Sequence, residues 1–459
     1  MIRLRAAGPT VRLDMVTVVR DRSRGPRCAA VLAIAVGVAV LAAACNGPSE
    51  RSSAGTTAAV PTGSLGLADC LSASRCYSPN QLRTAYGIQP LLNEGDDGSG
   101  QTVVLPELVQ AAPAASPKVT DIRQDLADFD KQFGLPAARI QVLTTLAGSP
   151  ASPWLAGVEE VVDTEMVHAV APNATIRELL VAPAAVETPA KDAATFAAQV
   201  RIGASHGDVI SLSGGYGEHF DTSAEVSTVN SALEYSAARH VTFVASSGDG
   251  GAISDLDKWG SSTPVKEVSL PASDPLVLAV GGTTLTAKPV TGTYVSETAL
   301  NTLPQLIDGH SQGSGGGFSH LFARPAYQNG VPGIGAMRGV PDVAADGSST
   351  TGMAFVFAAP GGFALLPEGG TSAAAPFWAG LIALADQRAG HPLGSVNSAI
   401  YQIARGPDYH KAFHDVTTGN NTVVVNGSTI TGYQAGPGWD PVTGWGTPDA
   451  QVLIPLLAR

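Results

Sequence analysis

Charged residues are scarce in this sequence. Asp, Glu, Lys and Arg make up 14% of its 459 residues, whereas it holds 52 Gly and 32 Pro. This balance favours tight turns on a compact scaffold over long exposed helices. Internal repeats and coiled-coil heptads are lacking too, which argues against a solenoid or a fibrous protein. With 44% hydrophobic residues, the chain can bury a sizeable core as one large domain or two ordinary ones.

Cysteines are also few, and two of the four, Cys28 and Cys45, fall in the N-terminal segment. The other two, Cys70 and Cys76, enclose five residues, a small loop that is plausible for a disulfide formed outside the cytoplasm. A metal site would need more ligands than this pair. We therefore predict a Cys70–Cys76 disulfide in a linker of residues 46–76.

Residues 1–45 have the pattern of an export signal. Seven Arg precede the apolar run AAVLAIAVGVAVLAAAC, which ends in small residues before Cys45. We therefore expect the protein to be extracellular or at the cell surface. Three alternatives stay open. The apolar run could be a short membrane anchor, Cys45 could carry a lipid anchor to the membrane because LAAAC resembles a bacterial lipoprotein box, and Met15 could be the true start.

Basic residues become rarer still once the export signal is removed. Residues 1–44 hold seven Arg and two Asp of the 27 basic and 39 acidic residues, so 20 and 37 remain and the net charge becomes −17. Such a charge argues against nucleic acid or an anionic membrane as a partner. It is compatible with work at acid pH. No second apolar stretch is long enough to span a bilayer.

From Tyr77 onward, short runs of β-branched residues alternate with Ala-rich stretches. We predict buried strands at residues 102–109, 139–145, 174–182, 208–215, 241–249 and 276–285, and helices such as 226–240. This alternation predicts an α/β fold with a mostly parallel central sheet flanked by helices. Catalytic groups are then expected at the carboxyl ends of the strands.

The string EGGTSAAAPFWAGLIALADQ, residues 368–387, places Ser372 where a Gly-rich turn enters an apolar helix. At a helix N-terminus, backbone N–H groups favour negative charge near a reacting serine. The same position also suits a serine that only caps the helix. GGTSAAAP resembles the nucleophile motif of the subtilisin-like serine peptidases and their sedolisin relatives, which favours the nucleophile.

A nucleophilic serine needs a base, and no His has the sequence context for this role. His206 is the only one of nine His that Gly follows, and it runs straight into a strand rather than opening a helix. Ser372 also lies outside a G-x-S-x-G motif. The string GVEEVVDTEMVHAVAPNATI instead places Glu159 and Asp163 four residues apart, on one face of a helix. Two carboxyls that share a proton form a usable base at acid pH, and a solvated acidic face is the alternative.

These blocks together resemble the sedolisin family of serine-carboxyl peptidases. The likeness covers about residues 77–459. It includes YSPNQLRTAYGI, the E-x-x-x-D helix, SLSGGYGE, SSGDGG after a strand, GGGFSHLFARPAYQ, RGVPDVAA and GGTSAAAP. The resemblance implies a subtilisin-like fold and one peptidase domain over these residues.

The resemblance also implies a role for each site residue. Ser372 corresponds to the nucleophile, Glu159 to the general base and Asp163 to the carboxyl that supports the base. Asp249 corresponds to the acid that stabilises the oxyanion, which requires it to be protonated. Without the resemblance, Asp249 would be a turn residue. A Glu with an ordinary pKa of about 4.3 accepts a proton at acid pH, where a His is already protonated.

A structural calcium site is a further implication of the family. FHDVTTGNN and YQAGPGWDPVTGWGTP supply Asp415 and Asp440, whose carboxylates are the hard oxygen ligands that suit Ca²⁺. By resemblance, the backbone carbonyls of Val416, Gly436 and Gly438 complete the site. We expect one ion.

Two features depart from the family pattern. Secreted members usually carry a large pro-domain, whereas residues 46–76 are only 31 in number, below the ~40 at which independent folding becomes difficult. Gly215 stands where the family often has Trp, which predicts a different substrate subsite.

From the sequence we expect an exported, monomeric, calcium-binding endopeptidase or tripeptidyl-peptidase that cleaves peptides or proteins at acid pH. Two alternatives stay open. One is a catalytically silent surface binding protein on the same fold, and the other is a neutral-pH subtilisin-like hydrolase with a His base.

Overall fold

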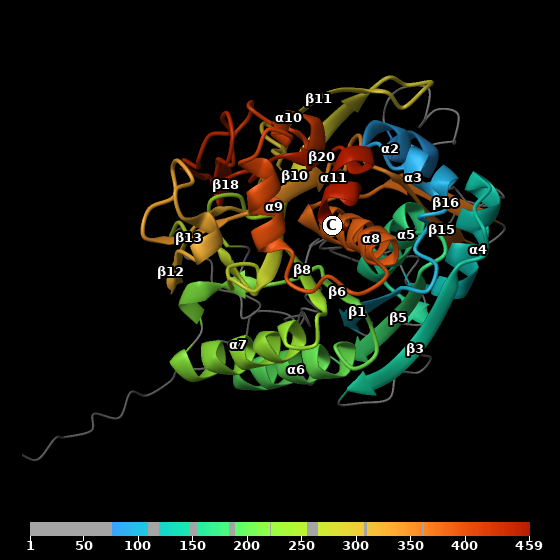
Figure 1. The fold of residues 1–459 in the computed structure, drawn as a ribbon, viewed down its shortest axis with the longest axis horizontal. Helices are drawn as coiled ribbons and strands as arrows, with labels where there is room; N and C mark the ends of the chain where they lie inside the picture. The colour runs from blue at the N-terminus through green and yellow to red at the C-terminus, as the bar shows by residue number, and fades with distance from the viewer. Residues whose placement is uncertain are drawn as a thin grey trace, which may run out of the picture. The chain divides into compact units, whose positions relative to one another are not determined.

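A central β-sheet organises the fold (Figure 1). The computed structural model describes residues 76–108, 119–146, 154–182, 189–220, 222–254, 265–306, 310–359 and 362–459. The export signal, Cys45 and Cys70 lie outside these residues. Within them, no helix combines the length and the apolar character needed to cross a membrane.

The main sheet contains all six predicted strands. Its order is β3 (Arg139–Leu146), β5 (Thr175–Val181), β1 (Thr102–Leu108), β6 (Val209–Leu212), β8 (Thr242–Ser246), β10 (Val277–Ala287) and β11 (Tyr294–Ala299), and β14 (Val343–Asp346) also pairs with β10. Within the described residues, β10 and β11 are antiparallel and the other neighbours in this sheet are parallel. The predicted α/β fold with a mostly parallel sheet is therefore confirmed.

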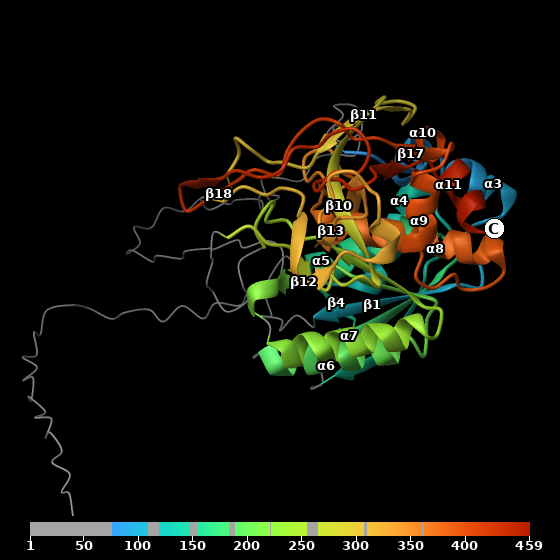
Figure 2. The same cartoon turned by 60° about the vertical axis from the view of Figure 1, so that its left-hand side comes forward.

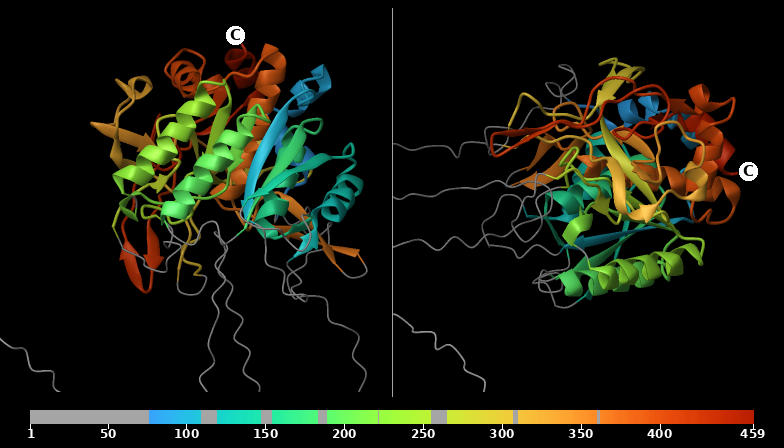
Figure 3. Two further views of the ribbon diagram at one scale, coloured as in Figure 1. Left: turned by 90° about the horizontal axis from the view of Figure 1, so that it is seen from below. Right: turned by 90° about the vertical axis from the view of Figure 1, so that its left-hand side faces the viewer.

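Helices cover both faces of this sheet. On one face lie α8 (Thr371–Ala389) and α5 (Val158–Val170), and on the other lie α6 (Pro189–Gly203) and α7 (Ser223–Ala237), which run side by side in Figures 2 and 3. The predicted helix 226–240 corresponds to α7, but it begins earlier because Thr222 caps it. The Thr222 hydroxyl accepts a hydrogen bond from the Glu225 amide at 3.3 Å, the first half of a capping box.

The alternation of side chains along β1 explains why two apolar clusters form. Val103 and Leu105 belong to the cluster that includes α5 and α8, whereas Val104 belongs to the cluster beneath α6 and α7. Strand side chains point alternately to the two faces of a sheet, so one buried strand supplies both clusters.

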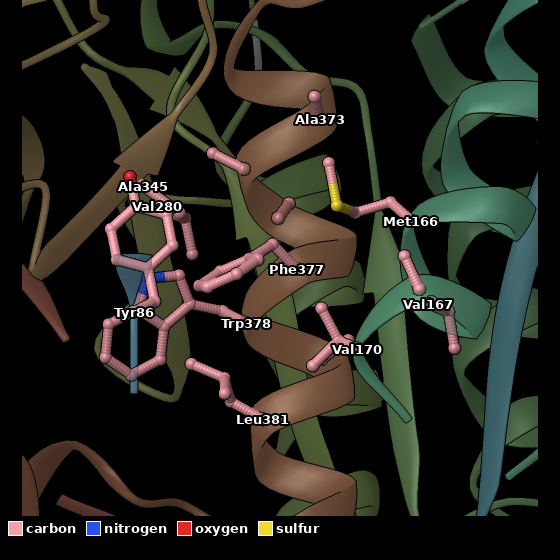
Figure 4. Packing of buried hydrophobic residues seen from close by; sticks show 14 of the residues in the cluster. Tyr86, Met166, Val167, Val170, Val280, Ala345, Ala373, Phe377, Trp378 and Leu381 are labelled. Carbon is pink, nitrogen blue, oxygen red and sulfur yellow. The ribbon is translucent and has the colours of Figure 1, made fainter. Parts of the chain in front are cut away.

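Helix α8 lies close against α5. Phe377 and Trp378 of α8 and Met166 and Val170 of α5 are buried in one cluster (Figure 4). A Cβ atom at Gly380 would lie 2.7 Å from Cβ of Val170, so only Gly permits this approach. Helix α8 is therefore held rigidly beside the helix that carries Glu159 and Asp163.

The other elements surround this framework. The shorter helices are α2 (Pro79–Ala85), α3 (Gln89–Glu94), α4 (Ile122–Phe133), α9 (Asn397–Ala404), α10 (Tyr409–Ala412) and α11 (Ala450–Leu457), with 3₁₀ turns at Glu218–Phe220 and Ala326–Gln328. The two-stranded pairs are β2 (Thr120–Asp121) with β4 (Leu155–Ala156), β7 (Tyr216–Gly217) with β9 (Ser269–Leu270), β12 (Gly317–Ala323) with β13 (Met337–Val340), β15 (Ala354–Ala359) with β16 (Gly362–Pro367), β17 (Phe413–His414) with β20 (Thr447–Pro448), and β18 (Val423–Val425) with β19 (Ser428–Ile430).

Cys76 is fully buried and disulfide-bonded. This agrees with the prediction for Cys76. Because Cys70 lies outside the described residues, the Cys70–Cys76 pairing and the 46–76 linker stay predictions.

Candidate active site

The start of α8 depends on Gly370. This residue has φ +86, and a Cβ atom there would lie 2.4 Å from Oδ2 of Asp249. A side chain would therefore be strained by the backbone conformation and would collide with the carboxyl group. Gly370 lets Asp249 pack against the N-terminus of α8, one residue before Thr371 and two before Ser372.

Asp249 follows β8 and is hydrogen-bonded to the first residue of α8. Its Oδ1 accepts from the Thr371 amide at 2.6 Å and from the Thr371 hydroxyl at 3.0 Å. Asp249 is 9% exposed. Burial raises its pKa above the ordinary value, against the lowering effect of the two Thr371 bonds. The Asp249 carboxyl therefore keeps its proton to a higher pH than an exposed Asp does.

Ser372 and Glu159 meet across the α5–α8 contact. Ser372 is the second residue of α8, and Glu159 is the second residue of α5. Burial and the charge of Asp163 raise the pKa of Glu159 well above its ordinary value, while a hydrogen bond with the Ser372 side chain lowers it. The structure thus brings the Ser372 side chain close to the carboxyl group that the sequence predicts to be its base.

Asp163 lies one helical turn after Glu159, on the same face of α5. It is 1% exposed, and its Oδ1 accepts a hydrogen bond from the Ser213 hydroxyl at 2.8 Å. Burial raises the pKa of Asp163 to about 7, although hydrogen bonds with Ser213 and with Glu107 lower it. All four predicted catalytic residues therefore gather at the start of α8, at the end of the strands where catalytic groups are expected.

Ser213 was not singled out from the sequence, yet it connects two parts of the site. Its hydroxyl lies 2.8 Å from Oδ1 of Asp163 and 3.0 Å from the Ser372 carbonyl oxygen. That carbonyl would normally accept from the amide four residues later, but this residue is Pro376, which has no N–H. The Ser213 hydroxyl lies within donor distance of this carbonyl, and its single proton serves either the carbonyl or Asp163 at one time. The Pro in GGTSAAAP is the sequence signal that could have led to it.

Glu107, near the end of β1, is a second residue that the sequence analysis missed. It is 4% exposed and lies close enough to Asp163 to affect the pKa of that carboxyl. Burial raises the pKa of Glu107 well above its ordinary value, and the charge of Asp163 adds to this effect. A charged residue inside the apolar string TVVLPELV is a recognisable signal, because Glu is almost never buried without a partner.

A cluster of buried acids without basic partners surrounds the start of α5. Within the described residues, no Lys, Arg or His forms an ion pair with any of its five carboxyls, which belong to Glu107, Glu159, Glu160, Asp163 and Glu178. Burial raises the pKa of Glu160 to about 7 and that of Glu178 to about 8. Below these pH values the carboxyls are protonated, so they do not repel one another.

These raised pKa values predict that the folded protein loses stability as pH rises. Above about pH 4 the unfolded chain releases protons that Asp163, Glu160 and Glu178 retain in the fold up to about pH 7 to 8. Each retained proton lowers the free energy of unfolding by about 1.4 kcal/mol per pH unit over that window. Urea unfolding at a series of pH values measures this slope. Stability that increases between pH 5 and 8 would contradict the protonated cluster.

His206 does not lie in this arrangement. It is exposed at the end of α6, on the face of the sheet opposite α8, and its Nδ1 lies 2.8 Å from the Ile202 carbonyl oxygen. His206, the one His that Gly follows, therefore lies on the opposite side of the sheet from Ser372. The contact between Ser372 and Glu159 favours a carboxyl base over a His base.

Gly215 has a steric reason to be Gly. A Cβ atom at this position would lie 2.6 Å from the Leu270 carbonyl oxygen of β9. The short strand β7, which starts at Tyr216, pairs with β9 at this point. A Trp would fit here only if β9 moved away. This chain therefore lacks both the Trp and the space for its side chain.

The predicted calcium ligands also lie together. Oδ2 of Asp440 is 3.2 Å from the Gly436 amide, and Oδ2 of Asp415 is 3.0 Å from the Gly438 amide. The Thr443 hydroxyl connects Asp440 with the Val416 carbonyl oxygen, at 3.0 and 3.4 Å.

The oxygen atoms at this place fit a hard cation. Within the described residues, neither Asp415 nor Asp440 has a Lys or Arg partner. Two carboxylates and the Val416 carbonyl oxygen are donors of the kind that suits Ca²⁺, whereas Gly436 and Gly438 direct their amides at the carboxylates. A group of three or more His, Cys, Asp or Glu is absent from the described part of the chain, so any such site would have to use backbone oxygens.

Comparisons with known proteins agree with this arrangement. The profile of the Subtilase family matches residues 144–403. Kumamolisin of Bacillus sp. (strain MN-32) is 33% identical over 404 residues, which cover 84% of this chain and 65% of kumamolisin. Tripeptidyl-peptidase 1 of Homo sapiens is 32% identical over 259 residues, which cover 53% of this chain and 42% of that protein. The chain thus spans less than two thirds of the length of both relatives.

A solved structure has the same fold. Pseudomonas sedolisin, a serine-carboxyl proteinase complexed with two molecules of pseudo-iodotyrostatin, is matched with a TM-score of 0.69 and 27% identity. The match covers 83% of this chain and 97% of that one.

Proposed function

We propose that this chain, which belongs to the subtilase family and within it to the sedolisins, hydrolyses peptide bonds with Ser372 as nucleophile and Glu159 as general base. The observation that carries this proposal is that the Ser372 side chain lies close enough to the buried Glu159 carboxyl to lower its pKa. A serine hydroxyl needs an adjacent base to become a nucleophile, and here a carboxyl group lies beside the hydroxyl at a helix N-terminus.

In the proposed acylation step, the Ser372 oxygen attacks the carbonyl carbon of the peptide while Glu159 takes the hydroxyl proton. The resulting oxyanion accepts a hydrogen bond from protonated Asp249, which lies at the same helix N-terminus. The C–N bond then breaks as Glu159 passes its proton to the leaving amine. An acyl-enzyme on Ser372 remains.

In deacylation the same groups act on water. Glu159 takes a proton from a water molecule, whose oxygen attacks the acyl carbon. Collapse of the second tetrahedral intermediate returns the proton to Ser372 and releases the new carboxyl terminus. Asp163 supports Glu159 throughout, and Ser213 holds Asp163 in place at 2.8 Å.

The proposed activity at acid pH requires Glu159 to ionise at a lower pH than Asp249, although burial raises the pKa of both carboxyls. Glu159 has to lose its proton to act as a base, whereas Asp249 has to keep its proton to act as a donor. Both conditions hold only in a pH range between the two ionisations. In this range a His base would be protonated and inactive.

We further propose that the protein is exported and acts on peptides or proteins. The Arg-rich segment and apolar run before Cys45 support export, and lipid attachment at Cys45 stays a proposal. A serine-carboxyl proteinase and a tripeptidyl-peptidase both match the chain, so we keep an endopeptidase and a tripeptidyl-peptidase as the two forms of this proposal.

The experiment that tests this function is a pH series of peptide cleavage with products identified by mass. Cleavage that is fastest at acid pH supports the proposal. Release of tripeptides from a free N-terminus identifies a tripeptidyl-peptidase, whereas internal cuts identify an endopeptidase. Absence of cleavage at every pH would favour a silent binding protein on this fold, and a rate maximum at neutral pH would favour a His base.

We also propose that Asp415 and Asp440, with the carbonyls of Val416, Gly436 and Gly438, hold one structural Ca²⁺. An ion that binds only the folded state stabilises it, so we expect the melting temperature to rise by several degrees with millimolar Ca²⁺. In Asp440→Ala this rise should disappear. Differential scanning calorimetry with and without chelator measures it. A melting temperature that neither Ca²⁺ nor chelator changes would exclude the site.

A further inference from the structure

Two buried carboxyls beside the site have no role in the proposed mechanism. Glu160 follows Glu159 on α5, and Glu178 lies on β5; each is 2% exposed. Burying a carboxyl group costs free energy unless it is hydrogen-bonded or neutral. Their contacts therefore indicate what the two groups do.

Glu160 holds the first turn of α5. Its Oε2 accepts a hydrogen bond from the amide of Gly157, the residue before the helix, at 2.8 Å. Its Oε1 is buried and has no hydrogen-bond partner among the described residues. The turn that Glu160 caps is the one that carries Glu159.

Glu178 holds the second turn of α5. The Thr164 hydroxyl donates to Oε1 of Glu178 at 3.4 Å, and Thr164 directly follows Asp163. In the parallel β1–β5 register, Glu178 is opposite Leu105, whose side chain belongs to the cluster with α5. Glu178 therefore points from the sheet toward the helix. Its neighbour Arg177 bonds to the Gln141 side chain and lies on the other face.

Among the described residues, the titratable groups that face Glu160 and Glu178 are all acidic. They are Glu159 and Asp163 on α5 and Glu107 on β1.

The bases and the other acids that contact α5 lie elsewhere on it. Arg83 of α2 donates to the Ala169 carbonyl oxygen, and His168 pairs with Asp130 of α4 at 2.7 Å, both near the C-terminus of α5. Glu165 accepts from the Val356 amide of β15 at 2.9 Å. Oδ1 of Asp125 on α4 accepts a hydrogen bond from the Ala358 amide at 2.6 Å. A charge on Glu160 or Glu178 thus meets no opposite charge among the described residues.

We propose that Glu160 and Glu178 form a latch that positions Glu159 and Asp163. Glu160 caps the first turn of α5 through the Gly157 amide, and Glu178 ties the second turn to β5 through the Thr164 hydroxyl. Ionisation of the two buried carboxyls would release the start of α5. The inference rests on the proposed function, because it concerns how the base is positioned. Glu160 and Glu178 are positioning residues, since neither touches Ser372 in the proposed reaction.

Electrostatics agree with this geometry. Burial raises the pKa of Glu160 to about 7, and burial together with the charge of Glu160 raises the pKa of Glu178 to about 8. At acid pH both groups are neutral and can stay buried. As pH rises, two like charges develop in an acidic, apolar environment, and their repulsion acts directly between α5 and β5.

The test replaces the latch by groups that cannot ionise. Glu178→Gln and Glu160→Gln keep the shape of the side chain and one acceptor oxygen but stay neutral at every pH. We expect the alkaline limb of the pH profile of kcat/KM to move to higher pH by roughly 0.5 to 1 unit in each variant. The maximal kcat should stay within about twofold of the wild type. A limb that stays in place or moves downward would overturn the latch.

A second measurement does not depend on catalysis. Amide hydrogen exchange of residues 157–164, corrected for the intrinsic pH dependence, should accelerate at neutral pH in the wild type and much less in Glu178→Gln. Equal acceleration in both proteins would overturn the latch. If the wild type cleaves no peptide at any pH, the proposed function fails while hydrogen exchange still decides on the latch.

Asp125→Asn is the matched control. Asp125 is a buried carboxyl whose pKa burial raises to about 6, but it faces β15 rather than β5. This variant should leave both the alkaline limb and the exchange of residues 157–164 as in the wild type. The same upward shift in Asp125→Asn would mean that the loss of any buried acid extends the pH range, and the latch would be wrong.

Discussion

Ser372→Ala is expected to lower kcat for peptide cleavage at the optimal pH by several orders of magnitude. Removal of the nucleophile from a serine peptidase of this fold costs on the order of 10⁶ in kcat, and the residual rate comes from binding and oxyanion stabilisation. The Ala side chain is smaller than Ser and suits the first turn of a helix, so α8 should form unchanged. Single-turnover cleavage followed by mass spectrometry measures the loss and shows whether an acyl-enzyme forms.

The control for this prediction is Ser205→Ala, which removes an exposed hydroxyl bonded to the Arg201 carbonyl oxygen at the end of α6. Its activity should equal that of the wild type. Both variants should unfold within about 2 °C of the wild type, the size of an ordinary surface effect. Full cleavage by a purified, folded Ser372→Ala protein would end the peptidase assignment.

The sheet was predictable because buried parallel strands have a strong sequence signal. The runs that became β1, β5 and β10 are rich in apolar and β-branched residues, and turn residues bound each of them. Ends of elements were less predictable, because local hydrogen bonds determine them. Helix α7 starts at Ser223 rather than at Val226 because Thr222 caps it.

The four proposed catalytic residues could be singled out because each lies in a short string with a physical reason for its spacing. Glu159 and Asp163 share a helix face, and Ser372 opens a helix. The structure adds what a linear string cannot contain, namely that α5 and α8 approach closely enough for Glu159 to reach Ser372. Part of that approach depends on Gly380, whose role is visible only once Val170 of the other helix is placed.

The supporting groups were missed because their partners are distant in the chain. Ser213 lies 159 residues before the Ser372 carbonyl to which it donates, and the need for such a donor arises only from Pro376. Glu107 and Glu178 are single acids in apolar strands. The sequence marks them as unusual, but only the parallel pairing of β1 with β5 places both on the side of α5. Sheet register is a property of tertiary structure, so a strand's own residues do not reveal it.

Asp249→Asn and Asp249→Ala are expected to differ strongly in rate. In the fold, Oδ1 of Asp249 accepts from the amide and the hydroxyl of Thr371. Asn can keep this acceptor with its own Oδ1 and place its NH₂ group where a protonated carboxyl would donate. Ala loses the acceptor and the donor together. We expect kcat to fall on the order of 10²- to 10³-fold in Ala, the usual cost of one oxyanion donor, and much less in Asn.

The pH dependence separates an oxyanion donor from a structural residue. Burial raises the pKa of Asp249, so the wild type keeps this proton above the ordinary Asp range and loses activity when the proton leaves. An Asn donates at every pH, so the alkaline limb of Asp249→Asn should move upward if Asp249 sets that limb.

Thr371→Val is the control for a purely structural role. It removes the hydroxyl bond to Asp249 but keeps the amide bond and the carboxyl itself. It should therefore change the melting temperature more than the rate. If Asp249→Ala folds normally and cleaves at the wild-type rate over the whole pH series, Asp249 has no part in catalysis. The oxyanion must then be stabilised by other groups at the N-terminus of α8, and the mechanism proposed here would be wrong at this step.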